Sequence, residues 1–110
     1  MAVTSVGTGS QVIAALDTEY TLDTETNAGV YVLVVDCNVL ANGDTIVIRI
    51  YTKYASGGTS RVAYQQSFSN VQVEMNKYSP AVPVDEEIVC KIEQTDGTER
   101  TFPWNLLKIS

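Results

Sequence analysis

The chain contains no histidine among its 110 residues. Histidine is the commonest general base of enzymes and the commonest protein ligand of metal ions, so its absence argues against both kinds of site. A Gly-x-Ser-x-Gly turn, a phosphate-binding loop and a dinucleotide fingerprint are absent as well. Two carboxylates would suffice for a glycosidase, but a chain this short offers little scaffold for a cleft, so a small hydrolase is the least favoured alternative. We therefore expect a protein that is not an enzyme and that has no cofactor and no metal.

Charged side chains are scarce, at 18% of the residues against about 25% in an average soluble domain. The net charge is -6, and the seven lysines and arginines are spread along the chain. Binding to nucleic acid needs a basic face, and an acidic chain is repelled by anionic lipids, so we expect neither nucleic acid nor a membrane as a partner. Uncharged polar surface costs less to desolvate than charged surface, so this composition favours contacts between subunits.

Long apolar runs are also missing, because the longest one, residues 30–35, is far too short to span a membrane. The N-terminal residues have neither the basic nor the apolar segment of a secretory signal. We therefore expect a chain that starts at Met1 and folds in a reducing cytoplasm. In that compartment Cys37 and Cys90 are expected to be reduced thiols that pack as small apolar residues, not a disulfide.

What the chain does contain is a succession of segments in which apolar and polar residues alternate, separated by turn pairs such as Asn42-Gly43 and Asp96-Gly97. The pattern predicts an all-β fold, either an antiparallel β-sandwich or a small β-barrel of about seven to eight short strands. We expect a single β-domain over residues 11–110. Residues 1–10, rich in Gly, Ser and Thr, are expected to form a flexible N-terminal arm. The segments expected as strands are 11–16, 30–35, 45–54, 61–68, 71–75, 88–94 and 98–109.

Two of these segments predict how side chains are oriented. In residues 45–54, Ile46, Ile48 and Ile50 share one face and are expected in the core, while the intervening residues form an outer face. Residues 29–36 are apolar on both faces. Such a strand is expected either at the centre of a sandwich or covered on both sides by neighbouring subunits.

Three groups of side chains could form ligand sites, and each has a structural alternative that we favour. Acidic residues at odd positions could bind a cation, but an extended segment would place them on a solvated face; they are Asp17, Glu19, Asp23 and Glu25. Oxygen-bearing residues around a turn could ligate a hard cation, but such residues are common in turns; they are Asp36, Asn38, Asn42 and Asp44. Aromatic residues could form a platform for a sugar or a partner, but in strands they mostly pack; they are Tyr31, Tyr51, Tyr54, Tyr64 and Trp104.

Arg61 and Arg100 each follow a turn that contains glycine. The two arginines could lie at one end of a sheet and pair with carboxylates of a neighbouring subunit. The alternative, which we favour, is ordinary hairpin chemistry with solvated arginines.

Two stretches of the chain resemble a known class of protein. The first runs from Ile50 through Gly57-Gly58-Thr59-Ser60-Arg61 to Tyr64-Gln65-Gln66-Ser67-Phe68, and the second covers residues 91–104 and ends in Phe102-Pro103-Trp104. Together they resemble small β-rich structural proteins of tailed bacteriophages. The resemblance covers roughly residues 28–108. It is a shared pattern of hairpins, not a catalytic motif.

The resemblance implies a capsid decoration, or cement, protein. Such a protein would be made in the bacterial host cytoplasm, would form a homotrimer, and would bind the major capsid protein on the capsid surface of the virion. A head-tail connector or tail component, and a carbohydrate-binding β-sandwich, are the alternatives. The interface is expected on the strand face that carries Tyr31 and Leu33 and on the N-terminal arm. The full set of expected interface residues is Val3, Val6, Tyr31, Leu33, Tyr51, Arg61, Arg100 and Trp104.

Overall fold

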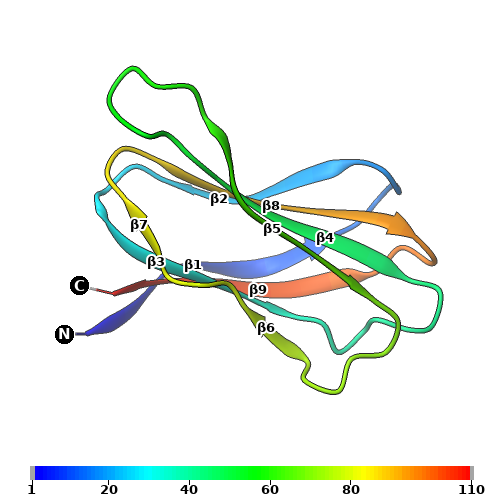
Figure 1. Ribbon diagram of the computed structural model, residues 1–110. Helices are drawn as coiled ribbons and strands as arrows, with labels where there is room; N and C mark the ends of the chain where they lie inside the picture. The colour runs from blue at the N-terminus through cyan, green and yellow to red at the C-terminus, as the bar shows by residue number, and fades with distance from the viewer. Residues whose placement is uncertain (1, 110) are drawn as a thin grey trace.

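The computed structural model describes residues 2–109 as an all-β sandwich of two antiparallel sheets (Figure 1). The prediction of an antiparallel β-sandwich is thus confirmed. The described residues form nine strands instead of seven to eight. Residues 71–75, expected as a strand, form a loop, whereas residues 19–25 form a strand and two three-residue strands, β6 and β7, follow the loop. The strands are β1 (Val3–Val12), β2 (Glu19–Glu25), β3 (Gly29–Asp36), β4 (Thr45–Thr52), β5 (Arg61–Ser69), β6 (Asn76–Tyr78), β7 (Val82–Val84), β8 (Ile88–Asp96) and β9 (Thr101–Ile109).

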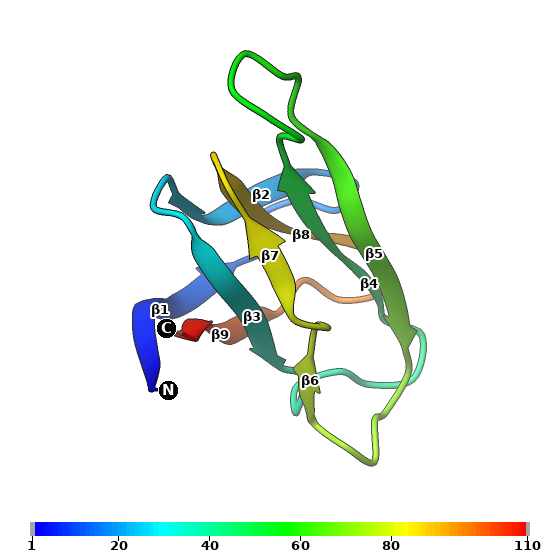
Figure 2. The same cartoon turned by 60° about the vertical axis from the view of Figure 1, so that its left-hand side comes forward.

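The first sheet, called sheet A here, has the order β1-β9-β3-β6, with β7 also pairing with β3. The second, sheet B, has the order β2-β8-β4-β5. Strands β9 and β3 are therefore central in sheet A, and β4 and β8 are central in sheet B. Figure 2 shows that the loops before and after β5 lie at opposite ends of that strand.

The core lies between the sheets and is built from alternate residues of the central strands. Each buried Ile, Leu or Phe side chain contributes about 1.5–3 kcal/mol relative to leaving it exposed. Ile46, Ile48 and Ile50 of β4 are all buried, which confirms the orientation predicted for that strand. The other central strands supply Tyr31, Leu33, Val35, Ile88, Cys90, Ile92, Phe102 and Leu106.

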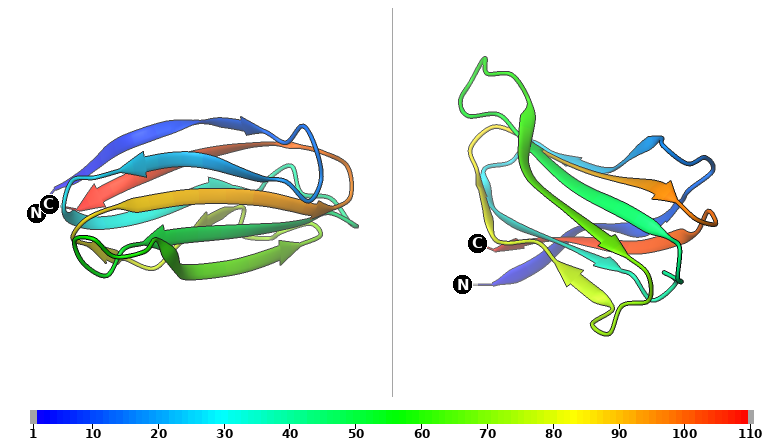
Figure 3. Two further views of the ribbon diagram at one scale, coloured as in Figure 1. Left: turned by 90° about the horizontal axis from the view of Figure 1, so that it is seen from above. Right: turned by 45° about the vertical axis from the view of Figure 1, so that its right-hand side comes forward.

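The segment expected to be a flexible arm is instead an ordered edge strand. β1 pairs with β9 from Val3 opposite Ile109 to Val12 opposite Thr101, with a bulge at Val6. Gly9 faces the indole of Trp104, and a side chain there would meet the ring at 3.5 Å. The glycines that made this segment look like a linker thus lie within a paired strand (Figure 3 shows β1 alongside β9), and a side chain at Gly7 would collide with the carboxylate of Asp23.

The strand expected at residues 11–16 lies earlier in the chain than predicted, and only Gln11 and Val12 of that segment belong to a strand. β1 ends at Val12, and Asp17 has a positive φ of 57° in the turn that follows. The chain turns there because it must cross from sheet A to sheet B before β2 begins.

Removing residues 2–10 should destabilise the domain, because most of β1 is lost and Trp104 and Leu106 lose the strand that pairs with them. We expect the free energy of unfolding to fall by at least about 2 kcal/mol, the scale of exposing one large apolar side chain. Chemical denaturation of the truncated chain, compared with a control that lacks only Ala2, measures this change. Equal midpoints would contradict the role of β1 and support a dispensable arm.

Candidate interaction surface

The outward face of sheet A is unusually apolar for the outside of a sandwich. Partners in an antiparallel ladder point to the same side of the sheet. Because Leu33 and Leu106 form a buried pair, the alternate pairs point outward: Val32 lies opposite Leu107, and Val30 lies opposite Ile109. A sandwich strand normally alternates apolar inward with polar outward residues, so β3 departs from this rule.

The same surface continues onto the neighbouring strands. Tyr78 of β6 pairs with Val34, and Val3 of β1 pairs with Ile109. We call the outward side of sheet A the A face. Its apolar residues, all at least partly exposed, are Val3, Val12, Val30, Val32, Val34, Tyr78, Pro83, Pro103, Leu107 and Ile109.

Charge is nearly absent from the A face. The outward positions of β1 hold Ser5, Thr8 and Ser10, which pair with Leu107, Asn105 and Pro103. Asp36, at the end of β3, is the one charged residue among the described outward positions of sheet A, and its carboxylate accepts a hydrogen bond from the N–H of Asn38 at 3.0 Å. Lys108 pairs with Tyr31, so it leaves β9 on the inward side.

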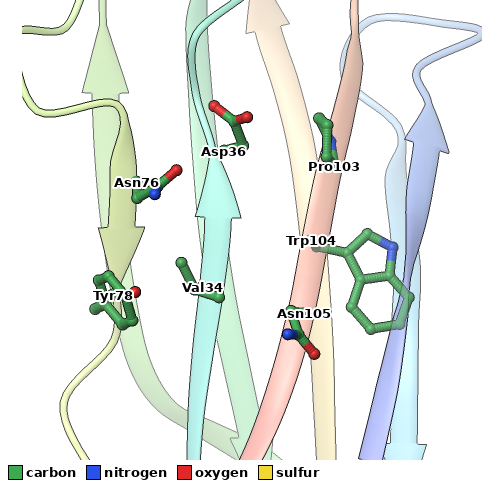
Figure 4. A pocket seen from close by; sticks show the side chains of 7 residues that line it. All are labelled: Val34, Asp36, Asn76, Tyr78, Pro103, Trp104 and Asn105. Atoms are coloured by element: carbon green, nitrogen blue, oxygen red, sulfur yellow. The ribbon is translucent and has the colours of Figure 1, made fainter. Parts of the chain in front are cut away.

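One end of the A face is hollowed into an open depression of about 200 Å³. Its lining comprises Val34, Asp36, Asn76, Tyr78, Pro103, Trp104 and Asn105. In Figure 4 the ring of Trp104 extends toward β1, away from Asn76 and Tyr78. Ligand pockets usually measure roughly 300–1,000 Å³, so the depression is better described as relief on a flat binding surface than as an active-site cleft.

The aromatic residues do not form a platform. Tyr31 is fully buried and donates a hydrogen bond to the backbone carbonyl of Asn27, whereas Tyr51 lies on the outer side of sheet B and donates to Glu19 at 2.9 Å. Tyr54 is 84% exposed in the loop after β4, and Tyr64 packs partly against the core.

The placement of Tyr31 and Leu33 on a contact face is therefore wrong. Both side chains are buried between the sheets, at 0% and 1% exposure. The strand is apolar on both sides, as predicted, but the residues on its outward side are Val30, Val32 and Val34. Of the other expected interface residues, Val3 lies on the A face, while Val6 and Trp104 pack partly against the core.

Arg61 and Arg100 do not lie together either. Arg61 is exposed opposite Thr52, at one end of β4. Arg100 donates through Nε to Asp44 at 2.9 Å, beside the other end of β4. The sheet order separates them, because β5 begins where β4 ends, whereas β9 follows the turn after β8.

Three of the four acidic residues lie on β2 and are divided between its two sides, while Asp17 lies in the turn before the strand. Glu19 lies on the outer side of sheet B, where Arg49 donates to it at 2.8 Å. Burial raises the pKa of Glu19, but the hydrogen bonds from Arg49 and Tyr51 and the charge of Lys91 outweigh burial and lower it overall. A bulge between Thr21 and Asp23 then reverses the alternation. Among residues 2–109, no cluster of three or more Asp, Glu, Cys or His side chains could hold a metal ion.

Asp44 also serves the protein itself. Its carboxylate is 2% exposed and accepts hydrogen bonds from the N–H groups of Ala41 and Thr98 and from Arg100. These contacts join the turn before β4 to the turn between β8 and β9. The side chain expected as a possible cation ligand is thus occupied by protein donors.

Comparisons with known proteins place the chain in no family: no family model and no curated protein matches it. A solved chain described as "Structure of infectious bursal disease virus Gx strain" is similar over 98% of this chain, with 12% sequence identity and a TM-score of 0.49. This chain spans 31% of that chain's length. In the described residues, no helix is long and apolar enough to cross a membrane.

Asp44→Asn should destabilise the domain and make its free energy of unfolding less dependent on pH. Burial raises the pKa of Asp44, but the hydrogen bonds from Ala41, Arg100 and Thr98 outweigh burial and hold it below the ordinary value. A carboxylate whose pKa is lowered on folding stabilises the protein above its unfolded-state pKa and loses that effect as the pH falls through the folded-state pKa. We expect a loss of about 2 kcal/mol at neutral pH. Denaturation curves between pH 7 and 2 should show the difference from the wild type shrinking below about pH 4, while the exposed control Glu99→Gln should show no such trend.

The two cysteines should be inert in the folded chain. Both thiols are free and buried, and burial raises the pKa of Cys37 to about 11 and that of Cys90 to about 12. Since the thiolate is the reactive form, a chromogenic disulfide reagent should label neither residue at pH 8 until denaturant is added. Rapid labelling without denaturant would contradict the packing described here.

Proposed function

We propose that the chain is a non-enzymatic structural protein of a virion, of the capsid decoration type. It would bind the major capsid protein on the assembled head and stabilise contacts between capsomers. The observation that carries this proposal is the A face, an apolar and almost uncharged surface that no described segment of the chain covers.

A surface of this kind supports an assembly role on energetic grounds. Monomeric proteins seldom expose contiguous apolar patches of more than a few hundred Å², and larger patches mark contacts with other proteins. The inward side of sheet A already packs against the buried residues of β4 and β8. The A face is therefore not needed for the fold of a single copy, and its apolar residues are explained by binding.

The sequence resemblance gives this role its specific form. The first resembling stretch lies on the β4–β5 hairpin, and the second runs from β8 through the turn that leads to β9 in the other sheet. Proteins with this pattern suggest a phage head as the place of action and a homotrimer as the assembly unit. The proposal includes synthesis in the host cytoplasm and a final position on the capsid surface, with no nucleic acid or membrane as a partner.

A second exposed apolar segment suggests where the shell is contacted. The loop after β5 carries Val71, Val73 and Met75, which are 62%, 90% and 47% exposed. It follows directly on Ser69 and leads into β6, so it projects beside the end of the A face (Figure 2). We assign this loop to the contact with the capsid protein.

Binding to heads tests the proposal directly. The purified chain should co-sediment with phage heads that lack it, and Val73→Asp should weaken this binding at least tenfold, because a charge would be placed in an apolar contact. Tyr54→Asp is the matched control, since Tyr54 is similarly exposed but lies in the loop at the other end of β5. Equal binding by both variants would show that the loop after β5 takes no part in head binding.

Immunogold labelling of intact virions locates the protein. Label over the head supports the decoration role, whereas label confined to the neck or tail would favour a connector or tail component. Failure to bind any particle, together with binding on a glycan array that is lost in Trp104→Ala, would favour the carbohydrate-binding alternative.

A further inference from the structure

We infer that the A face is buried against the A faces of other copies of this chain. The inference deepens the proposed function by naming the surface through which copies associate. It assigns the A face to self-association and leaves the loop with Val73 for the capsid protein. Three A faces turned toward a three-fold axis would form a triangular prism with a shared apolar interior.

The size of the A face approaches that of a specific protein contact of standard size. Strands lie about 4.8 Å apart with a rise of about 3.3 Å per residue, so the outward positions of the five strands cover roughly 500 Å² in projection. The relief of the side chains increases the accessible area toward the roughly 800 Å² per partner of a stable interface.

The chemistry of the face favours a second copy over a partner met late in assembly. The centre holds the β-branched residues Val30, Val32 and Val34 beside Leu107. Contacts of obligate homo-oligomers resemble a divided core and are more apolar than contacts formed between independently stable proteins.

The distribution of charge permits copies to approach through this face. Two chains that each carry a net charge of -6 repel one another, so a contact between copies needs a surface without acidic groups. On the A face only Asp36 is charged, and it lies at the end of β3, away from Val30 and Val32. The outer side of sheet B is the reverse, because Glu19 and Glu93 lie there around Arg49.

The mass of the protein in solution tests the inference. Light scattering on the purified chain should give about three times the monomer mass of 12.0 kDa, and Val32→Glu should reduce it to a single copy because a carboxylate would be placed in the apolar contact. Val73→Asp, the variant expected to lose head binding, should keep the wild-type mass. Loss of head binding with an intact oligomer would thus separate the shell contact from the contact between copies.

A cross-link keeps the test valid if Val32→Glu fails to fold. Val32→Cys should form intermolecular disulfides under mild oxidant, since Cys37 and Cys90 are buried and do not compete. Thr59→Cys, in an exposed loop, is the control that should stay uncross-linked. A wild-type chain that is monomeric at tens of µM, or a Val32→Cys chain that does not cross-link, would overturn the inference. If the wild type is monomeric and Val32→Glu abolishes head binding, the A face would be the contact with the capsid protein instead.

Discussion

The pairing of β3 with β9 in the middle of sheet A is the contact on which the other features depend. Along β3, Leu33 points inward to the core and lies opposite Leu106 of β9. Val32 points outward and lies opposite Leu107. One ladder therefore presents apolar side chains to both sides of the sheet. Sheet B packs against the inward side. The outward side is left exposed to solvent by the described residues of a single copy.

The turns at the far end of the sandwich fix where that ladder begins. Gln94 is fully buried, donates to the carbonyls of Asp96 and Thr98, and accepts from the N–H of Arg100. Gly97 has a φ of 91°, and a side chain there would collide with Asp44. Since β9 starts directly after this turn, these polar contacts determine which residues of β9 face inward, and so they also determine the composition of the A face.

The sequence pattern predicted the fold class and the faces of β4 because alternation in β4 is unambiguous. It failed for Tyr31 and Leu33 because a strand that is apolar on both sides carries no signal for which side is inward. It failed for β1 because pairing with β9 joins the two ends of the chain, and local composition cannot report such a partner. The bulge after Thr21 is a further case, since one extra residue reverses the face of every acidic residue that follows it.

The two outer sides of the sandwich therefore have opposite relations to water. On sheet B, Arg49 donates to Glu19, Glu93 and Gln65, so that one side chain links all four strands through charged and polar groups. Such a network stays hydrated at little cost and would be expensive to bury. Sheet A has no comparable network among its outward positions, and burying it removes apolar surface from water at almost no cost in charge. In the assembly that we propose, this chemistry would place sheet A against its neighbours and sheet B toward solvent.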